Sequence, residues 1–306
     1  MHPALPSGVH LKALETYDLI FKSIGTERLV QELSIYSNGL FPLLSHAAIN
    51  VKPSLLDIYV THFVPLGERL KPALDGFLIA VLPGLEDGSD YHGATEDLLK
   101  KVCDGVTKEF FYGSIWRCVF NNPSVRLPAV SFVTSQFNKK KSLEDQLYFM
   151  GTSLETLVNG VCTALLDPNV LVQRAILDLL LCCFPMHNSQ MVREDMISIT
   201  TAAVTVLLRR DISLNRRLMS WFFGLDISVA TMNRDKKVLS SSQVGSGQSR
   251  SKRKREVYFE SYTKPLLHEA FIMCLTVSYL LSNLRFIVLF LINRTHQKRS
   301  RCRLFG

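Results

Sequence analysis

The chain has 306 residues, of which 47% are hydrophobic, and its formal net charge at pH 7 is +8. The charge is concentrated at one end, since residues 250–306 hold twelve basic and three acidic side chains, a net +9 that leaves about −1 for residues 1–249. A nearly neutral body argues against a nucleic-acid groove on it, because such a groove needs clustered Lys and Arg on one face. The length allows a large core or an elongated array.

Motifs for catalysis, metal binding and export are not found in the sequence. The seven cysteines are scattered without C-x-x-C spacing, which predicts small buried side chains in a reducing compartment. Phosphate-cradling, dinucleotide-binding, zinc-protease and nucleophile-elbow motifs are missing, and the eight histidines are dispersed. The first residues do not form a secretory signal. We therefore expect a cytosolic protein that is not an enzyme and takes no cofactor, metal or small-molecule substrate.

The first 120 residues consist of short apolar segments separated by Gly and Pro. Their spacing predicts helices that begin near Ser7, Thr26, Phe41, Pro53 and Thr95. The first should stop at Gly25, and the last should continue towards Trp116. Residues 74–82 form an apolar run that should be buried, and residues 86–90 form an acidic loop.

Residues 167–184 are predicted to form one complete helix, with both its start and its stop signal present. Asp167 can cap its N-terminus, Pro168 suits the first helical position, and Pro185 ends it. The polar residues between these limits are Asn169, Gln173, Arg174 and Asp178. So narrow a polar strip predicts a helix that neighbours cover on nearly every side.

The same pattern of a capping residue followed by an arginine occurs three times. The caps are Asn122 (followed by Pro123), Asp167 and Asp211, and the arginines are Arg126, Arg174 and Arg217. Spacings of 45 and 44 residues between the caps fit the period of roughly 40 to 47 residues of HEAT and armadillo repeats. This predicts an all-α fold, an α-solenoid of HEAT/armadillo-like helical repeats, with helices over 143–165, 167–184, 191–208 and 211–223. The alternative is three unrelated helices with ordinary caps. Pro128 should bend or restart its helix.

The stretch from residue 209 to 221 has the densest mixture of arginine and aromatic residues in the body. Its candidate contact residues are Arg209, Arg210, Asn215, Arg216, Arg217 and Trp221. One interpretation is a tight turn in which Asp211 caps a helix and the arginines brace the adjacent repeat. The other is a contact with a protein partner or a lipid headgroup, because Arg and Trp are over-represented at interface hot spots.

The C-terminal quarter changes character. Residues 228–257 are rich in Ser and Gly and then basic, which predicts a disordered linker. Its bases Arg250, Lys252, Arg253, Lys254 and Arg255 could address a nucleus, touch anionic lipid or stay solvated. Residues 258–306 should be a helical segment with an apolar stretch, 271–292, and a basic tail.

The apolar stretch 271–292 spans about 33 Å as a helix, enough to cross a bilayer core of roughly 30 Å. Arg285 and Asn283 oppose insertion. One hypothesis is therefore an integral membrane anchor. The other is altered sequence, in place of a solenoid helix, that promotes membrane sticking or aggregation.

Several longer motifs carry a family resemblance: residues 2–10, 43–48, 82–89, 125–128, 170–174 and 209–218. From about residue 2 to 227, and again over 258–262, the chain resembles the N-terminal domain of the Dopey proteins. The resemblance implies a domain over 1–227, truncated at both ends relative to very large cytosolic proteins that sit peripherally on Golgi and endosomal membranes. It also implies a scaffold in traffic between endosomes and the trans-Golgi network, with an Arf-exchange-factor-like scaffold and an aminophospholipid flippase as partners.

Overall fold

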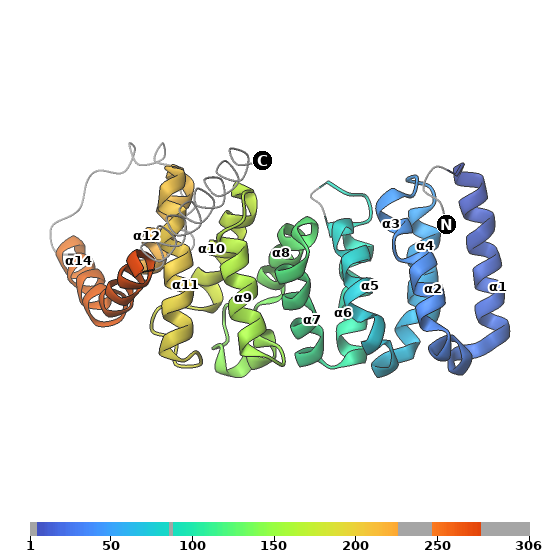
Figure 1. Ribbon diagram of the computed structural model, residues 1–306, viewed down its shortest axis with the longest axis horizontal. Helices are drawn as coiled ribbons and strands as arrows, with labels where there is room; N and C mark the ends of the chain where they lie inside the picture. Colours follow the sequence, from blue (N-terminus) through green and yellow to red (C-terminus); the bar gives the residue numbers. More distant parts are fainter. Residues whose placement is uncertain (1–4, 86–87, 226–246, 277–306) are drawn as a thin grey trace, which may run out of the picture.

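The computed structural model describes residues 5–85, 88–225 and 247–276 of the chain, with only the backbone described for 247–252. Within these ranges all regular structure is helical, which confirms the predicted all-α class. Figure 1 shows the helices standing side by side along one long axis. The arrangement is an array in which each helix packs against its neighbours in sequence.

The N-terminal third is built from short helices with several changes of winding. Its elements are α1 (Ser7–Gln31), α2 (Leu33–Leu40), α3 (Leu43–His46), α4 (Lys52–Ile58), the π-helical η1 (Tyr59–Phe63), the 3₁₀-helical η2 (Val64–Ala73) and η3 (Leu82–Leu85), and α5 (Leu74–Val81) between them. The predicted stop at Gly25 is a kink with φ 71° inside α1. The predicted burial of residues 74–82 is confirmed for most of the run, including Phe77.

The middle of the chain forms two layers of helices. Its elements are α6 (His92–Val106), α7 (Lys108–Asn121), η4 (Pro123–Val125), α8 (Arg126–Gln136), η5 (Glu144–Met150), α9 (Leu154–Leu165), α10 (Val170–Cys183), α11 (Arg193–Thr205), η6 (Val206–Arg209) and α12 (Ile212–Phe222). Helices α5, α7, α9 and α11 pack in one layer, and α8, α10 and α12 pack in the other. The pairs α7/α8, α9/α10 and α11/α12 are the three repeats.

Two helices that the sequence predicts as continuous are interrupted. The helix expected from Thr95 towards Trp116 is divided into α6 and α7 at Thr107, whose φ is 80°. The helix expected over 143–165 is broken at Gly151, with φ 74°, where η5 ends and α9 has not begun. Pro128 does not disturb α8, because it occupies the first turn, where the missing N–H has no helical partner.

Buried tryptophans connect neighbouring repeats. Trp116 on α7 and Trp221 on α12 are almost completely inaccessible to solvent. The Trp116 Nε1–H donates to the carbonyl oxygen of Phe149 at 2.8 Å, and the Trp221 Nε1–H donates to that of Phe184 at 2.8 Å. A buried indole needs such a partner, so each bond satisfies a polar group inside the stack.

The chain after the linker packs on the end of the array. Helix α14 (Gly247–Tyr258) and the π-helical η8 (Phe259–Thr263) lead into residues 264–276, which are also helical. The rings of Phe223 and Phe259 stack at 5.1 Å, and the Thr263 hydroxyl donates to the Phe222 carbonyl at 2.6 Å. Helical character from Tyr258 onward is therefore confirmed as far as residue 276.

The prediction of a disordered linker over 228–257 is wrong for its last part. Residues 228–246 lie outside the described residues, but from Gly247 the chain is helical. Composition alone misled the prediction, because Arg, Lys, Gln and Glu favour helix as well as solvent. The predicted apolar stretch 271–292 lies mostly outside the described residues, and among those described no helix has the length and apolarity to cross a bilayer.

The covered position of α10 predicts the effect of a charge in its buried face. Val172 is 2% exposed, so Val172→Asp should lower the free energy of unfolding by several kcal/mol, because it buries a carboxylate without a partner. The exposed Lys140→Asp is the control and should be nearly silent. Thermal melts compare both with wild type. Coincident melts of the two variants would contradict the packing described for α10.

Candidate functional site: the edge formed by the repeat turns

The turns inside the three repeats lie along one edge of the array. Helices α7, α9 and α11 of one layer run opposite to their partners α8, α10 and α12, so each turn within a repeat falls at the same end of the helices. Hydrogen bonds and ion pairs join these turns to one another. We call residues 120–126, 166–171 and 207–212 the turn edge.

The first and second turns are connected by a buried ion pair. Arg126 Nη1 lies 2.7 Å from Asp167 Oδ2, and both side chains are buried. The other guanidinium nitrogens of Arg126 donate to the carbonyls of Val119, at 2.9 Å, and Phe120, at 3.3 Å. Asp167 also accepts the Asn169 N–H at 2.7 Å. Because both partners make further hydrogen bonds, the desolvated charges are well satisfied.

Asp167 is therefore not the cap that the sequence predicts for α10. The helix begins at Val170, and Asn169 caps it by accepting the Leu171 N–H at 2.9 Å. Pro168 likewise precedes the helix instead of opening it. The sequence Asp-Pro-Asn offers two capping residues, and the one beside the first apolar residue takes the role. The carboxylate of Asp167 instead pairs with Arg126 of the preceding repeat.

The second and third turns are connected in the same way. Arg174 Nη2 lies 3.1 Å from Asp211 Oδ2, and Asp211 caps α12 by accepting the Leu214 N–H at 2.9 Å. Arg217 Nε lies 2.8 Å from Asp178 Oδ1. Each of the three arginines of the repeated pattern thus reaches an aspartate of a neighbouring repeat. In the first repeat Asn122 caps η4, which Pro123 opens, by accepting the Ser124 N–H at 3.1 Å.

The pKa values of Asp211 and Asp178 are shifted in opposite directions. The Leu214 N–H and, less strongly, Arg174 lower the pKa of Asp211 below its usual range. Burial raises the pKa of Asp178, because desolvation outweighs the attraction of Arg217.

The structure divides the predicted contact residues of the third turn into two groups. Arg217 is committed to Asp178, and Trp221 is 1% exposed, so neither can reach a partner. Asn215 and Arg216 on α12 are half-buried. Arg209 and Arg210 are exposed, although Arg209 Nη2 also donates to the Asp167 carbonyl at 3.2 Å.

Large apolar side chains on the turn edge were not singled out by the sequence analysis. They are Phe120 (43% exposed), Leu166 (56%), Leu171 (52%), Leu208 (82%) and Ile212 (76%). In the sequence they continue the apolar pattern of the adjoining helices, which predicts burial. Their position beside the caps is the only local signal that they project beyond the stack.

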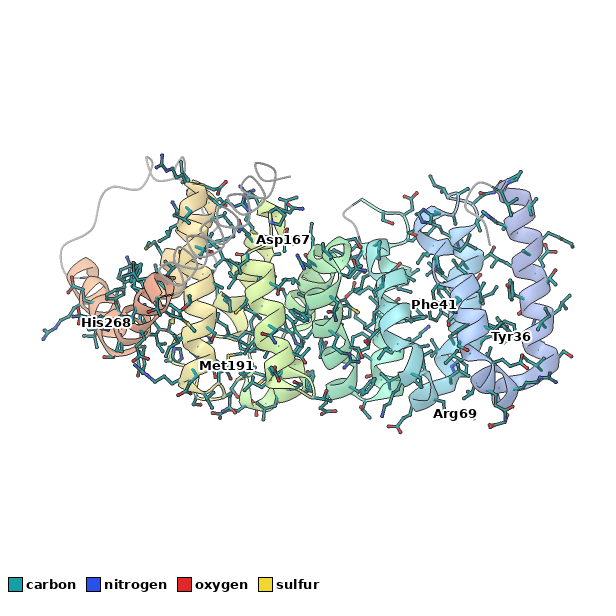
Figure 2. All side chains as sticks on the ribbon, viewed as in Figure 1. Tyr36, Phe41, Arg69, Asp167, Met191 and His268 are labelled. Carbon is teal, nitrogen blue, oxygen red and sulfur yellow. The ribbon has the colours of Figure 1, made fainter. Side chains whose placement is uncertain are left out.

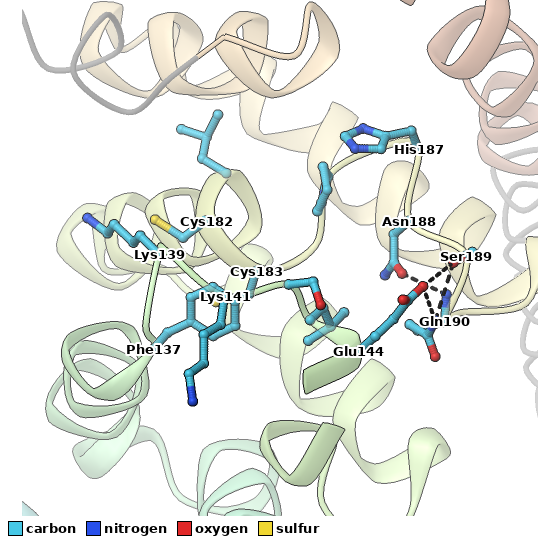
Figure 3. Close-up of a pocket in the computed structure, with 14 residues that line it drawn as sticks. Phe137, Lys139, Lys141, Glu144, Cys182, Cys183, His187, Asn188, Ser189 and Gln190 are labelled. Carbon is cyan, nitrogen blue, oxygen red and sulfur yellow. Dashed lines mark hydrogen bonds between the residues drawn. The ribbon is translucent and has the colours of Figure 1, made fainter. Parts of the chain in front are cut away.

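A cleft lies away from these turns, between the loops that follow α8 and α10 (Figure 3). It has a volume of about 460 Å³ and is lined in part by Lys139, Lys141, Glu144, Cys182 and His187. Glu144 accepts a hydrogen bond from Gln190 Nε2 at 3.1 Å. Burial raises the pKa of the Cys182 thiol, so this group is not an activated nucleophile. The lining suits binding of a polar, acidic segment better than covalent chemistry.

The basic residues of the predicted linker lie on α14. Arg253, Lys254 and Arg255 are exposed, whereas only the backbone is described at Arg250 and Lys252. Their assignment to a nuclear address, to lipid or to solvent stays a prediction. Figure 2 shows polar side chains spread along the whole array, and in the described ranges no three His, Cys, Asp or Glu residues come together as metal ligands would.

Stacked helix pairs whose turns are tied together by polar bonds define a helical-repeat protein. The family described as "Dopey, N-terminal" matches residues 1–227, and the chain belongs to the Dopey family. It is 45% identical over 278 residues to the Protein DOP1 homolog of Drosophila pseudoobscura pseudoobscura. The aligned region covers 91% of this chain and 10% of that protein.

Two further relatives have lower identity to the chain. The chain is 42% identical over 278 residues to Protein DOP1B of Mus musculus, covering 88% of this chain and 12% of that protein. It is 26% identical over 271 residues to Protein DOP1 of Saccharomyces cerevisiae, and the aligned region covers 73% of this chain and 16% of that protein. The chain thus spans about a tenth of the length of the two animal relatives. No solved structure matches it.

Removal of one partner from the buried ion pair should be strongly destabilising. Arg126→Ala leaves Asp167 charged and buried, and we expect a loss of about 3 to 5 kcal/mol in the free energy of unfolding. Lys12→Ala, which breaks an exposed pair with Glu15, is the control and should leave the free energy of unfolding nearly unchanged. Urea denaturation measures both. Equal losses would show that the pair between the turns contributes no more than a surface contact.

The pKa shifts predict opposite pH dependences for two variants. Asp211→Asn keeps the cap but removes the charge, so wild type should exceed it in stability above the unfolded pKa of about 3.9 and lose that advantage as the pH falls through the lowered folded pKa. For Asp178 the folded pKa is raised, so its contribution is lost as the pH rises, and the difference from Asp178→Asn should change in the other direction. Urea denaturation from about pH 3 to 7 tests this. Parallel pH profiles would contradict the assigned environments.

Proposed function

We propose that the chain is a non-enzymatic scaffold in membrane traffic between endosomes and the Golgi, and that it binds protein partners through the surfaces of its repeats. Membership of the Dopey family carries the proposal, since the match includes the whole array from α1 to α12. A stack of helix pairs supports it physically, because such arrays present long, nearly rigid surfaces to partners.

The proposed location is cytoplasmic, peripheral on Golgi and endosomal membranes. The proposed partners are an Arf-exchange-factor-like scaffold and an aminophospholipid flippase. Both proposals rest on the family and on its scaffold role.

The cleft between the loops after α8 and α10 is our candidate for one protein contact. Lys139, Lys140 and Lys141 lie on the first loop and are exposed, and Glu144 is the acidic residue among those that line the cleft. This excess of positive charge is complementary to an acidic segment of a partner. Mutation of such rim charges chiefly changes the association rate and its salt dependence.

The test is co-precipitation of the proposed partners with the tagged full chain from cells, together with its position relative to trans-Golgi markers. We expect both partners to be recovered, and recovery to fall for Lys139→Glu with Lys141→Glu but not for the control Lys12→Glu with Lys101→Glu. Release of the chain by carbonate extraction is expected of a peripheral protein, whereas retention would favour an integral anchor at residues 271–292. Failure to recover either partner would overturn the scaffold proposal.

A further inference from the structure

We propose that the turn edge is a membrane-docking surface, which inserts its apolar tips into an anionic bilayer while its arginines contact lipid phosphates. This inference deepens the proposed function, on which it rests, by assigning the membrane contact to particular residues. Four observations on the described residues support it: the exposure of apolar side chains, the strained backbone at Arg210, the excess of positive charge, and the position of the turn edge away from the cleft.

Large apolar side chains are exposed on each of the three turns of the turn edge. Leu208 and Ile212 are the two most exposed large hydrophobic residues among those described, and they flank Arg209 and Arg210 in one turn. Single exposed leucines are normal on a protein surface. On the turn edge such side chains recur on three successive turns that an ion pair and a hydrogen bond join, and exposed apolar residues that gather in this way mark sites of interaction.

The backbone at Arg210 is held in an unfavourable conformation. Its φ and ψ are 55° and 24°, in the left-handed region where Gly or Asn is favoured. The array needs only a residue that closes η6 before α12, and Gly would do so without strain. An arginine in this position indicates a role for the side chain.

The turn edge carries more positive than negative charge. Arg126 is matched by Asp167, and Asp211 is matched by Arg174 from the neighbouring turn of α10. Arg209 and Arg210 remain without a carboxylate on the edge, since the bond of Arg209 is to a neutral carbonyl oxygen. Basic side chains close to an anionic leaflet are attracted by its negative surface potential.

The turn edge lies apart from the cleft of Figure 3. The apolar residues lie at the tips of successive turns, and the cleft of Figure 3 is lined by other residues, away from them. Protein hot spots are buried in fitted pockets, whereas apolar tips flanked by arginines suit the boundary between lipid headgroups and acyl chains. The occupant we infer is therefore a lipid surface.

The test uses an introduced fluorophore in the full chain. Trp116 and Trp221 are buried, so the emission of Leu208→Trp reports on the turn edge, and Leu19→Trp on α1 is the matched control at an exposed site. We expect brominated phosphatidylcholine–phosphatidylserine vesicles to quench and blue-shift the emission of Leu208→Trp but not that of the control. This readout separates the turn edge from any binding by residues 250–306.

Vesicle sedimentation supplies the second measurement. Leu208→Ser with Ile212→Ser should weaken binding to phosphatidylserine-containing vesicles roughly tenfold or more, because two apolar side chains leave the bilayer. Leu19→Ser with Ile35→Ser, both 67% exposed in wild type, is the control and should bind like wild type. Arg210→Gly should weaken binding while leaving the melting temperature equal or higher, an outcome that a purely structural role does not give.

Three results would overturn the inference. One is unquenched emission from Leu208→Trp on vesicles that bind the chain, which would place the lipid contact elsewhere. Another is equal binding of the leucine variants and their control. The third is loss of a co-precipitated protein with unchanged vesicle binding, which would make the turn edge a protein interface. Each can occur while the proposed partners still co-precipitate with wild type, so the scaffold proposal is tested separately.

Discussion

Stacking of helix pairs is the interaction on which the rest of this structure depends. A pair such as α9 and α10 buries only part of its apolar surface alone, because α10 offers a continuous core face that must be covered by α8 and α12. The hydrophobic effect supplies this attraction but does not fix how one pair sits on the next. The positions of the pairs are instead defined by polar contacts that cross between repeats.

These crossing contacts are of two kinds. The indole N–H groups of Trp116 and Trp221 reach backbone carbonyls of the adjoining repeat, and arginines of the repeated pattern reach aspartates of a neighbour. A buried pair such as Arg126 and Asp167 adds little net stability against an apolar replacement, but an offset stack would leave both charges unpaired. We infer that such pairs select one alignment of the repeats.

Much of this array could be predicted from the sequence, because helix starts depend on local chemistry. Asn122 and Asp211 cap the helices beside them, and the repeat spacing follows from the caps. What failed depends on distant parts of the chain. The carboxylate of Asp167 is taken by Arg126, and the break at Thr107 places a β-branched residue at positive φ, which no local preference favours.

Only part of the turn edge could be predicted from the sequence, again because the rest depends on distant parts of the chain. The sequence pointed to the arginines from residue 209 to 217 as one group, but whether an arginine braces a repeat or faces solvent depends on the aspartates that the neighbouring repeat supplies. Arg217 meets Asp178, whereas Arg210 meets no such carboxylate on the turn edge. The exposure of Leu208 likewise follows from where the stack ends. In a helical repeat, residues that brace the stack and residues that face solvent therefore lie within a few positions of each other. The side chains that the neighbouring repeat supplies determine which of the two roles each residue has.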